Sequence, residues 1–210
     1  MKRDCNIFYC GEGVWKAETS KGWMELTGSD PHGIRIMMEK DQIYPIFVTN
    51  IYFGAGNILK QDMLSLGGDV VVHKFFVNGK MESGSIVLLG TAKQYRLLQT
   101  KMYAQHWGLK ELAEDLKIII ENLKTYRELD ESDLNLSSLL NLDLSGIDFS
   151  QKEPAIEEVM KNLPLNRLKK DGFITLQLDK IPAEFSREQI KKMLFFPAIS
   201  RGYYIKMNGE

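Results

Sequence analysis

The chain has 210 residues, of which 44% are hydrophobic and 10% aromatic, enough to form one large domain or two small ones with a buried core. Its 27 Lys and Arg residues nearly balance its 28 Asp and Glu residues, and the net charge of −1 gives no general attraction to nucleic acid or to an anionic membrane. No segment reaches the roughly 18 apolar residues of a membrane-spanning helix, and the first residues lack the apolar stretch of a signal peptide. We therefore expect a cytoplasmic globular protein.

The beginning of the chain predicts short strands. Residues 6–28 mix aromatic and β-branched residues with Gly11, Gly13 and Gly22, a pattern typical of strands joined by tight turns. Residues 29–33 predict a loop, because Ser, Asp, Pro and Gly are the residues that turns favour. The strand-like stretch GIRIMM follows at 33–38. We therefore expect a β-rich lead-in.

The middle of the chain alternates between strand and helix patterns. Residues 43–51 predict a strand in which Pro45 favours an early or edge position. Residues 55–66 place apolar side chains at helical spacing and predict a helix, and two glycines after it permit the positive φ of a helix end. Valines at 70–72 begin another strand, and IVLLG at 86–90 is typical of a strand buried on both faces.

Three further signals lie in the same region. Asn78-Gly79 predicts a tight hairpin turn. Thr91 is a helix-capping residue type at the start of a second helical pattern. Residues 108–124 predict a third helix, with one continuous apolar stripe. Short joints between these elements favour a compact, layered α/β sheet.

The last third divides into two parts. Residues 125–153 are acidic and rich in Ser, Asn and Asp without a sustained period, so we expect a linker or long excursion there. Residues 154–210 predict a helix, a strand, a helix capped by Ser186 and a last strand, a βαβ-like arrangement. The fold class that follows is α/β, with α+β as the alternative, in which a layered mixed sheet is covered by helices. We expect residues 1–124 to form the main domain.

Metal and disulfide chemistry find little support. Cys5 and Cys10 are the only cysteines, and two thiols without a nearby histidine do not make a zinc site. On one strand their side chains would point to opposite faces, which argues against a disulfide between them. The chain contains no Ser-His-Asp order and no H-E-x-x-H helix. We expect no metal site, no cofactor and no catalytic residue.

Three stretches carry a family resemblance. ILKQDMLSLGGDVVV at 58–72, VLLGTAKQYRLL at 87–98 and AQHWGLKELAEDL at 104–116 resemble the N-terminal region that precedes the barrel in a subset of dihydropteroate synthases. The similarity runs from about residue 33 to about residue 124. It departs from the family pattern at Asp62, Val70-Val71 and His106-Trp107.

The catalytic part of that family has no counterpart here. Dihydropteroate synthases are similar to one another chiefly in a TIM barrel, which needs at least about 200 residues, and far fewer follow residue 124. The chain also lacks a D-I-G-G-E-S-T-R-P-G-like stretch. The resemblance therefore implies a relative of the accessory region alone, and it carries over no catalytic residue.

Two loops, residues 53–57 and 90–94, are candidate binding sites. Each joins a predicted strand to a predicted helix and can present free backbone amides. If both strands belonged to one parallel sheet, their ends would border a crevice. The alternative is that the glycines permit tight joints, Thr91 caps a helix and the polar residues face solvent. The candidate ligand-binding residues are Asn57, Lys60, Gln61, Gly90, Thr91, Lys93 and Gln94.

Three hypotheses about function follow. The first is a non-catalytic module that binds a protein partner or a pterin-like or anionic small molecule, with a link to folate metabolism implied by the resemblance. The second is an enzyme whose pocket lies between the α/β core and the C-terminal segment. The third is a homo-oligomer in which residues 125–153 clasp a neighbouring subunit. None of them involves nucleic acid or a membrane.

Overall fold

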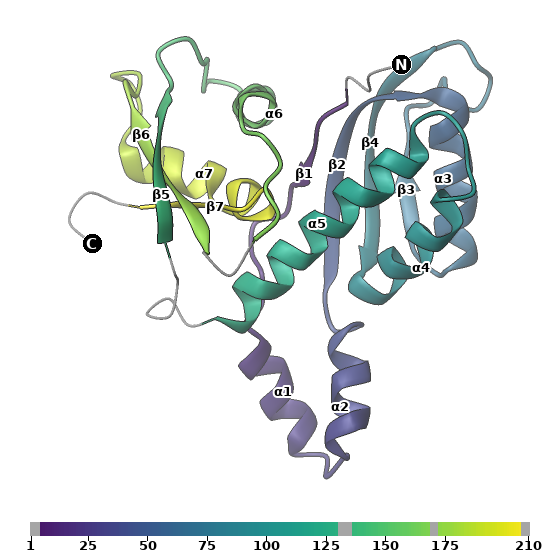
Figure 1. The fold of residues 1–210 in the computed structure, drawn as a ribbon. Coiled ribbons are helices and arrows are strands. Elements are labelled where there is room, and N and C mark those ends of the chain that lie inside the picture. Colours follow the sequence, from purple (N-terminus) through teal and green to yellow (C-terminus); the bar gives the residue numbers. More distant parts are fainter. Residues whose placement is uncertain (1–4, 130–135, 169–171, 207–210) are drawn as a thin grey trace.

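A computed structural model describes residues 5–129, 136–168 and 172–206 (Figure 1). Those residues form seven helices and two sheets, which confirms a mixed α/β fold. No helix among them is long and apolar enough to cross a membrane. In chain order the elements are β1 Ile7–Tyr9, α1 Ala17–Glu25, α2 Pro31–Met38, β2 Ile43–Tyr52, α3 Phe53–Ser65, β3 Asp69–Val71, β4 Ser83–Thr91, α4 Ala92–Met102, α5 Leu109–Glu128, β5 Leu136–Asp143, α6 Lys152–Asn162, β6 Phe173–Asp179, α7 Arg187–Ser200 and β7 Tyr203–Ile205.

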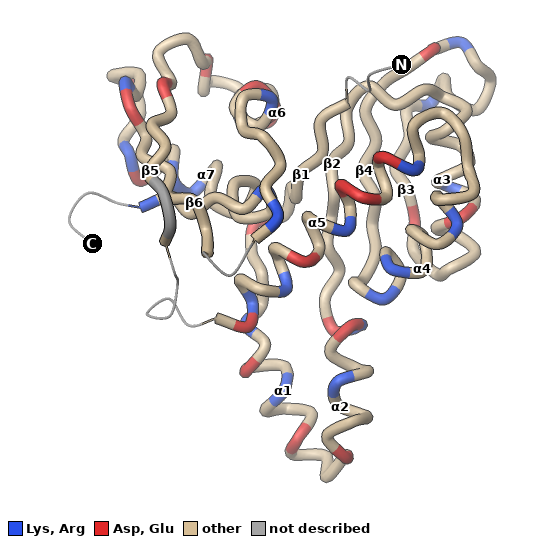
Figure 2. The backbone as a smooth tube through the Cα atoms, in the orientation of Figure 1, with Lys and Arg blue, Asp and Glu red and all other residues tan. Residues whose placement is uncertain are grey.

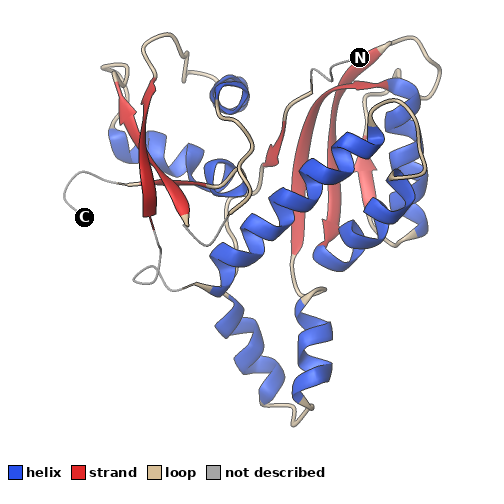
Figure 3. Ribbon diagram, in the orientation of Figure 1, coloured by secondary structure: helices blue, strands red, loops and turns tan. Residues whose placement is uncertain are grey.

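The first lobe, residues 5–129, is built on an antiparallel sheet with the strand order β1-β2-β4-β3. Helices α3, α4 and α5 lie against this sheet (Figure 3). The expectation that β4 is buried on both faces is wrong: Ile86 and Leu88 are buried, whereas Val87 and Leu89 between them are only half-buried. One face of the sheet therefore supplies most of the core.

The second lobe, residues 136–206, is built on a parallel sheet with the order β5-β6-β7. Helix α7 connects the parallel strands β6 and β7, which confirms the βαβ-like arrangement near the C-terminus. Helix α6 connects β5 and β6 in the same way, so the lobe holds two such units. Its own apolar core includes Leu176, Leu178, Ile190 and Leu194.

The segment 33–38 belongs to helix α2, so its prediction as a strand is wrong. The side chain of Asp30 accepts hydrogen bonds from the backbone N of His32 (2.9 Å) and of Gly33 (3.0 Å), and Pro31 occupies the first turn. An Asp cap followed by Pro is a strong helix start and outweighs the short alternation of apolar residues. The β-rich lead-in is also wrong beyond β1, because α1 follows it.

Two other local predictions need correction. The tight hairpin at Asn78-Gly79 is wrong, because β3 and β4 are joined by residues 72–82 and Gly79 makes a turn within that connection, with φ at 66°. The absence of a sustained period in 125–153 also misleads, because α5 extends into this predicted linker or excursion and β5 lies inside it. Residues 130–135 of that stretch lie outside the described residues. Pro45 does lie early in its strand, although β2 is an internal strand.

The two lobes are joined through β1. The backbone N of Tyr9 donates to Ser200 Oγ at 3.0 Å, and Arg201 Nη1 donates to Asn6 Oδ1 at 2.8 Å and to the carbonyl of Ile7 at 2.6 Å. Phe8 points the other way, into the core of the second lobe. The three-residue strand β1 thus belongs to the sheet of one lobe and packs on the core of the other.

Candidate functional site

The two predicted binding loops do not share a crevice. Strands β2 and β4 are antiparallel, with Ile43 opposite Thr91 and Tyr52 opposite Ser83. Residues 53–57 therefore lie at one end of the sheet and residues 90–94 at the other. The expectation of a common site at the ends of parallel strands is wrong, because a run of apolar residues does not reveal the direction of a strand.

In the first loop region, the polar side chains bind other parts of the protein. Asn57 Nδ2 donates to the carbonyl of Phe76 at 3.0 Å. Lys60 Nζ donates to the Asp69 carboxylate at 2.9 Å and to the carbonyl of Val70 at 2.8 Å, which ties α3 to β3. Gln61 lies exposed on α3. Asn57 and Lys60 thus have structural contacts that account for their positions.

In the second loop region, Thr91 and Gln94 form a reciprocal helix cap. Thr91 Oγ1 accepts from the backbone N of Gln94 at 3.4 Å, and Gln94 Oε1 accepts from the backbone N of Thr91 at 2.8 Å. The amide of Gln94 also donates to the carbonyl of Leu66 at 3.1 Å. The backbone N of Lys93 donates to the carbonyl of Glu39 at 2.9 Å. These bonds join the start of α4 to α3 and α2.

Gly90 makes close packing possible at the same place. A Cβ atom on Gly90 would lie 2.6 Å from Cε of Met63, which is shorter than a van der Waals contact allows. Glycine here lets α3 approach the sheet, and no open space for a ligand lies over that atom. A ligand-binding role for this loop remains a prediction.

The clearest site-like feature is a helical hairpin that projects from the first lobe. Helices α1 and α2 form this hairpin, which we call the arm and define as residues 17–38 (Figure 1). Helix α1 buries none of its side chains, and α2 buries only Ile34. Most helical stability in proteins comes from packing of an apolar face. A pair of helices with so few buried side chains is therefore unusual.

A buried ion pair anchors the base of the arm. Arg127 on α5 binds the Asp41 carboxylate through both guanidinium nitrogens, and the two side chains are 4% and 7% exposed. Arg127 Nη2 also donates to Ser20 Oγ on α1 at 3.1 Å. Burial lowers the pKa of Arg127, but Asp41 and Tyr44 more than offset this effect and raise it above its ordinary value. Arg127 therefore remains charged and links α1, α5 and the start of β2.

A lysine provides a second anchor. Lys16, directly before α1, donates from Nζ to the carbonyls of Tyr126 (3.1 Å) and Leu129 (2.7 Å) at the end of α5. The same ammonium lies 4.2 Å from the centre of the Tyr126 ring, within the range of a cation–π contact. The orphan carbonyls of a helix C-terminus attract such a cation. The arm is thus fixed at its base and open toward its tip.

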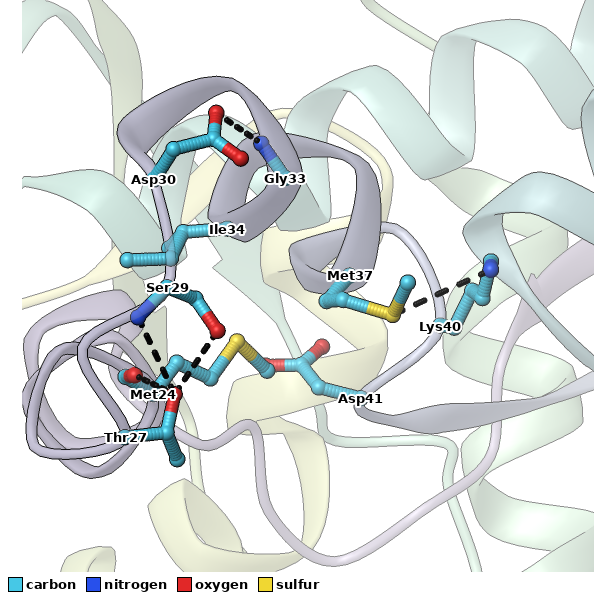
Figure 4. Close-up of a pocket in the computed structure, with 9 residues that line it drawn as sticks. All are labelled: Met24, Thr27, Ser29, Asp30, Gly33, Ile34, Met37, Lys40 and Asp41. Atoms are coloured by element: carbon cyan, nitrogen blue, oxygen red, sulfur yellow. Dashed lines mark hydrogen bonds between the residues drawn. The ribbon is translucent and has the colours of Figure 1, made fainter.

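A pocket of about 490 Å³ lies in the arm (Figure 4). The side chains of Met24, Ile34 and Met37 give it apolar walls, one from α1 and two from α2. The nine lining residues are Met24, Thr27, Ser29, Asp30, Gly33, Ile34, Met37, Lys40 and Asp41.

The polar groups of this pocket mostly stabilise the arm itself. Thr27 Oγ1 lies 2.7 Å from the carbonyl of Met24 and 2.8 Å from Ser29 Oγ, within the turn that joins the two helices. Asp30 caps α2, and Asp41 binds Arg127. The pocket therefore offers an apolar surface whose polar rim is already hydrogen-bonded, an arrangement better suited to an apolar group than to catalysis.

Large apolar side chains are exposed on the arm and next to it. Trp15, Trp23 and Leu26 are 65%, 71% and 78% exposed. Ile36 and Met37 on α2 are also exposed. Tryptophan is highly buried on average, and contiguous exposed apolar patches mark interaction surfaces. We call these five residues, four on the arm and Trp15 just before it, the apolar face of the arm.

The sequence contained a signal for this face. Trp15, Thr19, Gly22, Trp23 and Leu26 recur at helical spacing, and Asp30-Pro31 announces the next helix. The glycines and aromatic residues led to the interpretation as short strands instead. Within the described residues, no group of three or more His, Cys, Asp or Glu side chains could hold a metal ion, and Cys10 is an exposed free thiol.

Similarity to a known protein covers only part of the chain. Over 81 residues the chain is 33% identical to the bifunctional dihydropteroate synthase/dihydropteroate reductase of Helicobacter pylori, a match that includes 39% of this chain and 21% of that protein. The chain thus spans about a fifth of that protein's length. No protein-family model and no solved structure matches the chain. The similarity supports a relationship between regions of the two proteins.

Proposed function

We propose that this protein is a non-catalytic interaction module linked to folate or pterin metabolism, and that the arm is its binding surface. The observation that carries the proposal is the apolar face, on a hairpin whose first helix buries no side chain. The metabolic link is supported by the partial similarity to a dihydropteroate synthase/dihydropteroate reductase. The known activity of that relative is not part of the proposal.

Packing between the lobes favours binding over catalysis. An enzyme of the kind considered above would place its pocket between the α/β core and the C-terminal segment. In the described residues, aromatic side chains fill much of that region: the ring of Tyr9 lies 6.3 Å from that of Phe196, and Tyr126 lies 5.8 Å from Phe195. Arg201 uses its guanidinium to join the lobes and not to line an open site.

Binding of a small molecule is the second candidate, and the pocket in the arm favours it. Its volume of about 490 Å³ lies within the range of small-molecule sites, about 300–1,000 Å³. Lys40 at its rim supplies a positive charge for an anionic group. A pterin-like or anionic ligand would contact Met24 and Met37 with its rings.

The interaction is tested by binding to the dihydropteroate synthase of the same organism, measured by biolayer interferometry. The double variant Trp23→Ser, Leu26→Ser removes the centre of the apolar face and should weaken binding at least about tenfold. Val77→Ser is the matched control, because Val77 and Leu26 are both 78% exposed but Val77 lies in the connection between β3 and β4, at the other end of the first lobe. Equal binding by all three proteins would contradict an arm-mediated interaction with that enzyme.

The small-molecule candidate is tested by thermal unfolding with pterins, folate precursors and simple anions. A ligand at about 100 times its dissociation constant stabilises the native state by about 2.7 kcal/mol. Met37→Lys should abolish the shift if the ligand lies in the arm, whereas Gln61→Ala should abolish it if the ligand lies at the predicted loop. No shift with any compound would exclude those compounds as ligands and leave the protein interaction.

A further inference from the structure

We infer that the arm also binds a second copy of this chain, so that two arms pack side by side in a two-fold dimer. The inference rests on the proposed function and names a further partner of the same surface, beside the synthase against which that function is tested. It does not involve residues 125–153, which were considered above as an oligomer contact.

The arm carries both halves of a self-complementary contact. Trp23 and Leu26 are exposed on α1 and at its C-cap, and the pocket walled by Met24, Ile34 and Met37 lies in the same hairpin. Met37 belongs both to the pocket and to the exposed apolar face. A two-fold interface requires one patch to supply protrusion and hollow at once, since each copy must receive what it offers. Thioether side chains also adapt well to an inserted aromatic ring.

The size of the face suits such a dimer. A large aromatic side chain presents about 150–250 Å², so the five exposed side chains offer on the order of 600 Å² on one arm. Two such faces would bury about 1,200 Å², which is the lower end of the range for specific interfaces. An apolar patch of this size is at the upper end of what a typical monomer exposes, and such patches are often functional.

The charge of the arm permits a second copy to approach. Residues 17–38 contain three acidic residues, Glu18, Glu25 and Asp30, and two basic residues, Lys21 and Arg35. Lys21 and Glu25 pair with each other at 3.5 Å. Figure 2 shows the two signs interspersed along both helices. Because neither sign dominates, two arms would not repel each other, and the arm lacks the basic excess that anionic membranes attract.

Gly22 adds an independent indication. It lies inside α1, where glycine costs about 1 kcal/mol relative to alanine. Nothing in the chain requires glycine there, since a Cβ atom would meet no other atom within 4 Å and its φ is not in the left-handed region. It lies one helical turn before Leu26, on the same side of α1. A missing side chain at this point lets another helix come close.

Sedimentation velocity of the full chain, over about a hundredfold range of concentration, tests the inference. We expect a monomer–dimer equilibrium, weakened at least about tenfold in Trp23→Ser, Leu26→Ser and unchanged in the control Val77→Ser. Gly22→Gln separates folding from association: it should raise the melting temperature of the monomer, because glutamine is the better helix former, and yet weaken the dimer.

Each other outcome has a definite meaning. A wild-type chain that stays monomeric overturns the second copy as partner, as does a dimer that survives both arm substitutions. If the chain is monomeric but the double variant loses binding to the synthase, the proposed function stands and only this inference fails. If the chain is monomeric and synthase binding does not depend on the arm, both fail.

Discussion

Two buried arginines, Arg127 and Arg201, each link separate segments of the chain, and they bind different kinds of partner. Arg127, at the base of the arm, forms an ion pair with the Asp41 carboxylate. Arg201, at the junction of the lobes, donates to neutral oxygens: the carbonyl of Leu163 at 2.7 Å, the carbonyl of Ile7 and the side chain of Asn6.

The two guanidinium groups therefore differ in the direction in which their pKa is shifted. Burial lowers the pKa of Arg201 to about 10, because no carboxylate offsets the loss of water as fully as Asp41 does for Arg127. Arg201 still carries its charge at neutral pH, and its hydrogen bonds to carbonyls stabilise it. A paired charge fixes one geometry, whereas an arginine bound to carbonyls joins several backbone segments at once.

The largest expected effect comes from breaking the pair at the arm. Asp41→Ala leaves Arg127 as an uncompensated buried charge and should lower the free energy of unfolding by about 3–5 kcal/mol, measured by urea denaturation. The double variant Asp41→Leu, Arg127→Met should recover most of this loss, because no unpaired charge remains. A loss below about 1 kcal/mol in the single variant would show that the pair is solvated in solution.

Arg201→Met should have a smaller effect. It leaves no charge behind, but the carbonyls of Leu163 and Ile7 lose a donor, which costs about 1–3 kcal/mol in the same measurement. If this substitution costs more than Asp41→Ala, the contrast between the two arginines is wrong. The slope of the denaturation curve should stay constant, because both lobes unfold together through β1.

The smallest effect on the free energy of unfolding is expected from Tyr9, which connects the surroundings of the two arginines. Its ring packs on Tyr44 beside Arg127, and its backbone binds Ser200 beside Arg201. Burial, followed by Tyr44 and Cys10, raises the pKa of Tyr9 from 10.0 to about 12. The folded state thus holds its proton more tightly than the unfolded chain does. The stability from this group is fully present below pH 10 and is lost as pH rises toward 12.

At about pH 11 the loss from Tyr9 alone should be about 1 kcal/mol. Tyr9→Phe should reduce the alkaline loss of stability, measured by urea denaturation at several pH values, relative to Tyr52→Phe as an exposed control. Arg201 acts in the opposite direction in this range, since its pKa is lowered, so the variant must be compared with wild type at each pH. An unchanged pH dependence in Tyr9→Phe would contradict the role of burial.

Much of the fold could be predicted because its signals are local. The apolar stripe of α5, the Thr91 and Ser186 caps and the C-terminal βαβ unit each follow from residues within one or two turns. The direction of β2 relative to β4 could not, because antiparallel and parallel central strands share the same apolar composition. That direction decides whether the two candidate loops lie at the same end of the sheet or at opposite ends.

The arm escaped prediction for a different reason. Its helices begin with signals that were readable at Asp30-Pro31, but glycines and aromatics in α1 are equally typical of strands. The ion pair that anchors the arm could not be predicted either, because Asp41 and Arg127 are 86 positions apart in the chain. The exposure of Trp23 could not be foreseen either, since periodicity shows which residues share a face and not what covers that face.

The arm lies in the connection between two neighbouring strands of one sheet. Strands β1 and β2 are antiparallel neighbours, with Tyr9 opposite Ile46, so everything between them is in effect one very long hairpin loop. Loops between paired strands can be exchanged without altering the register of the sheet. A shorter loop in place of residues 17–38 would leave the four strands and both cores as they are. The scaffold and the arm can therefore diverge separately, and the same framework can carry a different insert at this position.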